Sequence, residues 1–119
     1  MSYNLAVWEG DRPADHRAAT TTFRAMYAEY AAAGGDTRGA PTTRLRAFVH
    51  ALLDQWPDIT DDLHDDSPWA AGPLMREAIG PFMCLAIMQA QRRPAGSFVA
   101  QIAREHGLIC YDPQTKRMI

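Results

Sequence analysis

Apolar and polar residues alternate along this chain with periods that predict three helices and at least four strands. The clearest pattern lies between residues 42 and 57, where one face of a helix is formed by Leu45, Phe48, Val49, Leu52, Leu53 and Trp56. Thr42 or Thr43 is expected to cap this helix. Pro57 is expected to end it, because proline cannot continue the ladder of backbone hydrogen bonds.

Two further helices are predicted on either side of it. The first begins near Asp11 to Pro13, carries one apolar face and stops at the glycine pair 34–35. That face consists of Phe23, Met26, Tyr27 and Tyr30. The last helix is expected to be capped by Ser97 and to end at Gly107.

Strand patterns fill the remaining segments. Residues 3–8 alternate in the manner of a strand, and the continuous apolar run 82–88 predicts a central strand that is buried on both faces. A strand over 69–79 is expected to be entered through the Gly72-Pro73 pair, and another covers 108–111. Asp112 to Gln114 should turn the chain toward a short edge piece at 116–119.

The resulting order is β-α-α-β-β-α-β, which predicts an α+β fold. We expect a two-layer sandwich, with helices on one face of a mostly antiparallel sheet, and a ferredoxin-like arrangement with one extra helix is the first candidate. At 119 residues, the chain is expected to form a single α+β domain over 1–119.

Composition narrows the classes of function. A hydrophobic content of 47% and a formal net charge of -2 are typical of a folded protein without the basic footprint that non-specific nucleic-acid binding requires. The first residues do not resemble a signal peptide, and no apolar run is long enough to span a bilayer. We therefore expect a cytoplasmic protein that acts without nucleic acid or membrane.

Negative charge is concentrated in one place. Six of the fourteen acidic residues fall within residues 54–66, which we call the acidic segment, and no Lys or Arg interrupts them. Trp56 lies inside this segment and Trp69 follows it. Concentrated charge beside large aromatic side chains is typical of a surface that docks a basic partner. The predicted partner-binding residues are Asp58, Asp61, Asp62, Asp65, Asp66 and Trp69. Trp56 continues the apolar face of its helix, which favours an inward position.

Other chemistry is less well supported by the sequence. The acidic segment lacks the central Gly and closing Glu of a twelve-residue Ca²⁺ loop, and His64 has no second ligand at zinc spacing, so no metal or cofactor is predicted. Cys110 lies near His106 and Asp112, but helix-end and turn roles explain those two residues better than catalysis does. Cys84 has apolar neighbours and is expected to be buried. Four arginines, Arg44, Arg46, Arg92 and Arg93, could bind an anionic ligand. The alternative is that their side chains form solvated surface.

Four segments resemble a family of small uncharacterised bacterial proteins, mainly actinobacterial. They are YNLAVWEGDRPA at 3–14, PTTRLRAFVHALLDQWPD at 41–58, DDSPWAAGPL at 65–74 and REHGLICYDPQ at 104–114. Such proteins are similar to the immunity proteins encoded beside secreted bacterial toxins. The resemblance implies inhibition by binding and provides no catalytic residue.

The sequence thus predicts a non-enzymatic protein-binding module. More specifically, we expect an immunity-type antitoxin that uses the acidic segment to block a cognate toxin, and the toxin is expected to have a basic surface. One alternative is a homo-oligomeric scaffold, such as a homodimer, that pairs through its edge strands. Another is a small-molecule sensor or enzyme that uses a pocket between the sheet and the helices.

Overall fold

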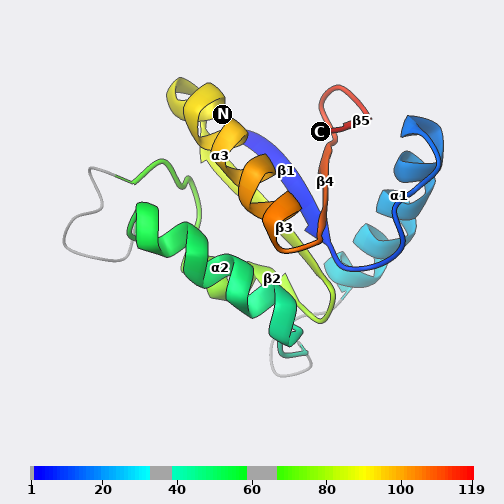
Figure 1. Ribbon diagram of the computed structural model, residues 1–119, viewed down its shortest axis with the longest axis horizontal. Coiled ribbons are helices and arrows are strands. Elements are labelled where there is room, and N and C mark those ends of the chain that lie inside the picture. Colours follow the sequence, from blue (N-terminus) through cyan, green and yellow to red (C-terminus); the bar gives the residue numbers. More distant parts are fainter. Residues whose placement is uncertain (1, 33–38, 59–66) are drawn as a thin grey trace.

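The protein is built on a five-stranded sheet in the order β2-β3-β1-β4-β5, in which every neighbouring pair is antiparallel (Figure 1). The computed structural model describes residues 2–32, 39–58 and 67–119. The strands are β1 (Ser2–Trp8), β2 (Ala78–Ile79), β3 (Phe82–Met88), β4 (Ile109–Asp112) and β5 (Arg117–Met118). The helices are α1 (His16–Ala32), α2 (Thr43–Gln55) and α3 (Arg92–Glu105), with short 3-10 helices η3 (Leu74–Glu77) and η4 (Gln89–Gln91). The predicted α+β class and antiparallel sheet are confirmed.

The connectivity is that of a ferredoxin-like unit with additions. Helices connect β1 to β2 and β3 to β4, and the strand order β2-β3-β1-β4 places β3 and β1 at the centre. In the central pair Leu5 lies opposite Leu85, and Val7 lies opposite Met83. The additions are β5 at one edge and one extra helix.

The larger part of the core lies between one face of the sheet and helices α2 and α3. Because successive strand residues point to opposite faces, Leu5 and Val7 share this face with Met83, Leu85 and Ile87. Helix α2 packs Leu45, Phe48, Val49 and Leu52 onto it, and α3 adds Ala95, Val99 and Ala103. These two helices follow the predicted arrangement, in which helices cover one face.

Helix α1 is the extra helix, and it covers the opposite face (Figure 1). Its apolar side meets the aromatic residues that the strands place there, namely Trp8, Phe82 and Tyr111. The ring centroids of Phe23 and Tyr111 are 5.0 Å apart, and those of Tyr30 and Phe82 are 5.2 Å apart. The position of α1 therefore differs from the expectation that all helices share one face, because its aromatic side matches the aromatic face of the sheet.

The helix ends confirm one prediction and correct two. Thr42 caps α2 through a side-chain oxygen that accepts from the Leu45 N–H at 3.3 Å, as predicted. Helix α1 begins later than expected, because the Asp15 carboxylate accepts from the Ala18 N–H at 2.8 Å and takes the capping role. Helix α3 begins at Arg92, so Ser97 is an exposed position inside the helix and not its cap.

The strand predicted over 69–79 is mostly absent. Trp69 forms only an isolated bridge with Ile87, and the chain then turns through η3 before the two-residue strand β2. Pro73 precedes η3 and has no N–H to donate to a ladder.

Glycine is required after α3, where Gly107 has a φ of 68° and the Leu108 N–H donates to the Ala103 carbonyl at 2.8 Å.

Candidate functional site

Two tryptophans join the residues on either side of 59–66, namely 56–58 and 67–70, which we call the base of the acidic segment. The indole N–H of Trp69 donates to the backbone carbonyl of Trp56 at 3.2 Å. The two rings meet edge to face, with centroids 6.0 Å apart. The Trp56 ring also contacts Phe98 of α3, at a centroid distance of 5.2 Å. The end of α2 and the chain that follows the acidic segment are therefore joined and packed against α3.

Trp69 does not form a surface anchor, which corrects the role predicted for it. Its side chain is 1% exposed and belongs to the core between the sheet and helices α2 and α3. Trp56 is half-buried and packs against the same core, in agreement with the inward position that helix periodicity favoured. Both tryptophans hold the base of the acidic segment together, and Trp69 has no exposed ring surface for a partner to contact.

Asp58 is the one predicted partner-binding aspartate within the described residues. It is half-buried, and its carboxylate accepts from the backbone N–H of Leu74 at 2.8 Å. This contact ties the start of the acidic segment to η3. Asp61, Asp62, Asp65 and Asp66 lie outside the described residues.

The far end of the base is fixed to the sheet. Met88 of β3 donates its N–H to the Pro68 carbonyl at 2.8 Å, and the Ala70 N–H donates to the Ala86 carbonyl at 2.7 Å. Sequence reasoning missed these backbone contacts, because no periodic pattern marks residues 67–70. The local concentration of proline and tryptophan is the only feature that distinguishes them.

The cysteine, histidine and aspartate near the end of the chain do not form a catalytic set. Cys110 is buried, and its burial raises the pKa of the thiol to about 12. The Nδ1–H of His106 donates to the Ile102 carbonyl at 2.9 Å, and Asp112 accepts from the Tyr3 hydroxyl at 2.7 Å. Each group is therefore engaged in a separate structural contact. Burial likewise raises the pKa of Cys84 to about 12, so that its thiol stays protonated at neutral pH.

Asp112 anchors the turn between β4 and β5. Burial by itself would raise the pKa of this carboxyl. Hydrogen bonds from the Tyr3 hydroxyl, from the Gln114 side chain and from the N–H groups of Gln114 and Thr115 outweigh that effect, so the pKa lies below its usual value. Within residues 2–32, 39–58 and 67–119, no three His, Cys, Asp or Glu side chains are grouped to hold a metal ion.

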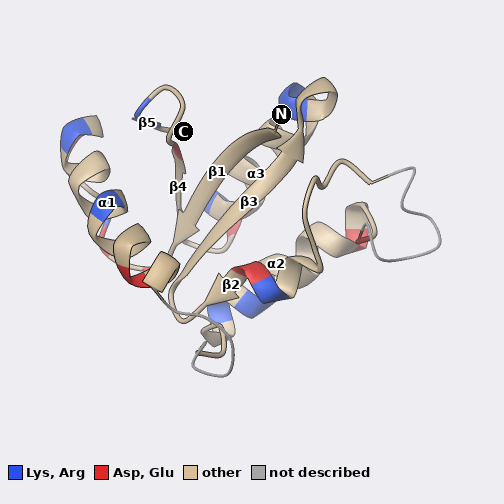
Figure 2. Ribbon diagram, turned by 180° about the vertical axis from the view of Figure 1, so that it is seen from behind, with Lys and Arg blue, Asp and Glu red and all other residues tan. Residues whose placement is uncertain are grey.

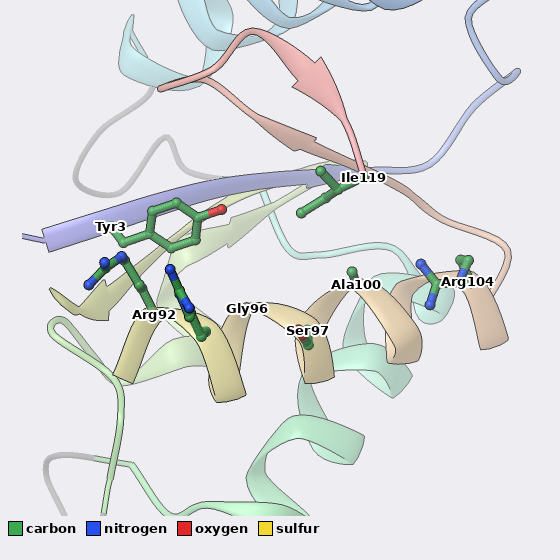
Figure 3. A pocket seen from close by; sticks show the side chains of 8 residues that line it. Tyr3, Arg92, Gly96, Ser97, Ala100, Arg104 and Ile119 are labelled. Atoms are coloured by element: carbon green, nitrogen blue, oxygen red, sulfur yellow. The ribbon is translucent and has the colours of Figure 1, made fainter. Parts of the chain in front are cut away.

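A groove of about 530 Å³ runs beside α3, and we call it the α3 groove (Figure 3). Its walls carry three cations and three small residues, namely Arg92, Arg93, Arg104, Gly96, Ser97 and Ala100. Tyr3 of β1 and Ile119 complete it. The basic pair at the start of α3 lies beside the N-terminal end of β1 (Figure 2). Of the predicted arginine group, Arg44 instead pairs with Glu9 at 3.7 Å, and Arg46 is exposed on α2.

No protein-family model, curated protein or solved structure matches this chain. Among the helices described, none is both long enough and apolar enough to cross a bilayer.

Proposed function

We propose that this protein is a non-enzymatic binding module that docks a basic protein through its acidic segment. The proposal rests on two observations: residues 54–66 contain six acidic residues and no Lys or Arg, and the base of this segment is held by hydrogen bonds of Trp56, Asp58 and Trp69. A patch of one sign attracts a partner of the opposite sign over a distance of about 10 Å at moderate salt.

The contacts at the base support this proposal energetically. Association has an entropic cost when a binding loop must be ordered, and that cost falls if its two ends are already held. Here the Trp56 carbonyl, the Asp58 carboxylate and the Pro68 carbonyl each accept one hydrogen bond from another part of the fold. The residues on both sides of 59–66 are therefore held by the fold before a partner binds.

The concrete form that we propose is an immunity-type antitoxin in the cytoplasm, whose partner is a cognate toxin with a basic surface. Its action would be steric and electrostatic blockade. Residues 3–14, 41–58, 65–74 and 104–114 resemble a family of small uncharacterised bacterial proteins, and the similarity of such proteins to immunity proteins supports this choice. A scaffold that pairs through edge strands is less favoured, because the edge strands β2 and β5 have two residues each.

The test begins with the genes beside the one for this protein, where the proposal predicts a secreted toxin, and continues with co-expression of that toxin's active domain. We expect the wild-type chain to restore growth of a bacterial host that expresses the toxin domain. Replacing Asp61, Asp62, Asp65 and Asp66 by Ser should remove that protection. In binding kinetics, the same quadruple variant should associate more slowly and with less dependence on salt.

A matched control separates a local effect from a change in total charge. Asp11 and Glu29 are exposed residues outside the acidic segment. Replacing both by Ser removes two negative charges, so this control is compared with the double variant Asp61→Ser with Asp62→Ser, which also removes two. The double variant within the acidic segment should weaken protection, and the control should leave it unchanged. If the quadruple variant protected cells and bound the toxin domain as well as the wild type at low salt, the proposal would be wrong. A neighbourhood of metabolic genes without a secreted toxin would argue against the antitoxin form.

A further inference from the structure

The α3 groove carries a stripe of residues that share one side of the helix. Arg93, Ser97, Ala100 and Arg104 are separated by four, three and four positions, which is the spacing of one helix face. With a rise of about 1.5 Å per residue, the two arginine positions are roughly 16 Å apart. Figure 3 shows Arg92 and Arg104 at opposite ends of the groove, with Gly96, Ser97 and Ala100 between them.

The cations of the α3 groove are available to a ligand. Nη1 of Arg92 donates to the Gln89 carbonyl at 3.1 Å, and the other N–H groups of Arg92 take no part in this hydrogen bond. Arg93 and Arg104 are exposed. Within the ranges that the structure describes, the recorded ion pair is that of Arg44 with Glu9, and none involves an arginine of the α3 groove. Guanidinium groups in such a setting match carboxylate and phosphate oxygens.

The floor of the groove suits a flat, extended occupant. A Cβ atom at Gly96 would lie 3.3 Å from Cε2 of Tyr3, so the tyrosine ring rests directly on the helix at this point. The Tyr3 hydroxyl donates to Asp112 at 2.7 Å, and the Asp112 carboxylate also accepts from the N–H of Gln114. The buried carboxylate of Asp112 therefore stays ionised, and these hydrogen bonds engage its oxygen atoms within the fold.

We propose that the α3 groove binds an extended acidic peptide segment of another protein. An extended chain advances about 3.3 Å per residue, so roughly five residues span the distance between the arginines at the two ends. Acidic side chains near both ends of the peptide would meet Arg93 and Arg104, and its backbone would pass beside the Tyr3 ring, which covers Gly96, with the Ser97 hydroxyl in reach. This proposal does not depend on the acidic segment, since it uses different residues of the opposite charge.

The experiment measures binding of fluorescein-labelled hexaglutamate by fluorescence anisotropy at low salt. We expect saturable binding that weakens as salt is added, and no binding of labelled hexaglutamine. Replacing Arg93 or Arg104 by Gln should weaken the affinity about two- to fivefold each, the effect of losing one partly exposed charge pair. Ser97→Glu places a carboxylate at the centre of the groove and should abolish binding. Because Ser97 is exposed inside α3, the variant is expected to fold, which circular dichroism would verify.

Arg24→Gln is the matched control, because Arg24 is an exposed residue of α1 on the other side of the sheet. It should bind hexaglutamate as the wild type does, and Arg93→Lys should retain most of the affinity. Equal binding by the folded Ser97→Glu variant and the wild type would overturn the proposal. Tighter binding of ATP than of hexaglutamate, lost in Ser97→Glu, would assign the groove to phosphate ligands instead. Salt-sensitive self-association that Ser97→Glu removes would assign it to a second copy of the chain and would equally overturn the proposal.

Discussion

Replacing Trp69 by Phe tests whether this residue closes the base of the acidic segment from inside the core. The indole N–H donates to the Trp56 carbonyl at 3.2 Å, and the side chain is 1% exposed. Phenylalanine keeps an aromatic ring but removes the donor, and the lost hydrogen bond is worth about 1 kcal/mol. The smaller ring also leaves buried space empty, at a cost of about 1–2 kcal/mol. The free energy of unfolding should therefore fall by about 2–3 kcal/mol.

The assay is urea unfolding followed by circular dichroism, together with the thermal midpoint. For a domain of this size, the expected loss lowers the midpoint by about 10 °C. Trp56→Phe is the control, because the Trp56 contribution to the hydrogen bond is its backbone carbonyl and its ring is half-buried. That variant should lose about 1 kcal/mol or less. If Trp69→Phe unfolded like the wild type but lost partner binding, Trp69 would be a surface anchor and the packing argument would be refuted.

Three further predictions follow from single contacts. Asp58→Ala should lower the free energy of unfolding in urea by about 1 kcal/mol, whereas Asp58→Asn keeps an acceptor for the Leu74 N–H and should lose less. Equal losses in the two variants would contradict a stabilising role for this hydrogen bond. Asp112 has a lowered pKa in the folded state, so its stabilisation is present above the unfolded value of about 3.9 and is lost as pH falls through the folded value. The acid-induced loss of stability, measured by urea titrations across pH, should therefore be smaller in Asp112→Asn, and identical pH slopes would count against this. Burial raises the pKa of the Cys84 and Cys110 thiols to about 12, so both should react slowly with a disulfide reagent at pH 8 in the folded protein and quickly in urea. Rapid reaction of the folded protein would show that burial does not protect the thiols.

Helix α2 and the central strands illustrate what local pattern can predict. The spacing of Leu45, Phe48 and Leu52 marks the buried side of α2, and all three are fully buried. The apolar run at 82–88 became the central strand β3, with partners on both sides. In such segments the local periodicity and the tertiary environment favour the same structure, so the pattern alone is sufficient.

The candidate site was predicted only in part. The concentration of charge in 54–66 is a property of composition and is visible in the sequence. The inward position of Trp69 and the contact between Asp58 and the Leu74 N–H were not visible, because both depend on residues brought close by folding. The α3 groove depends even more on folding, since Tyr3 and Arg104 line it together although about one hundred positions separate them in the sequence.

The amino-acid sequence by itself determined most of the local elements, the antiparallel α+β class and the place where negative charge gathers, because periodicity, proline positions and composition act over short stretches of chain. Only the tertiary structure decided on which face α1 lies. An aromatic stripe such as that of Phe23 and Tyr30 can in principle pack on either side of a sheet, and its partners Phe82 and Tyr111 come from strands far away in the chain. It also decided that Trp69 is buried in the core, since burial is set by packing between elements and leaves no trace in the neighbouring residues.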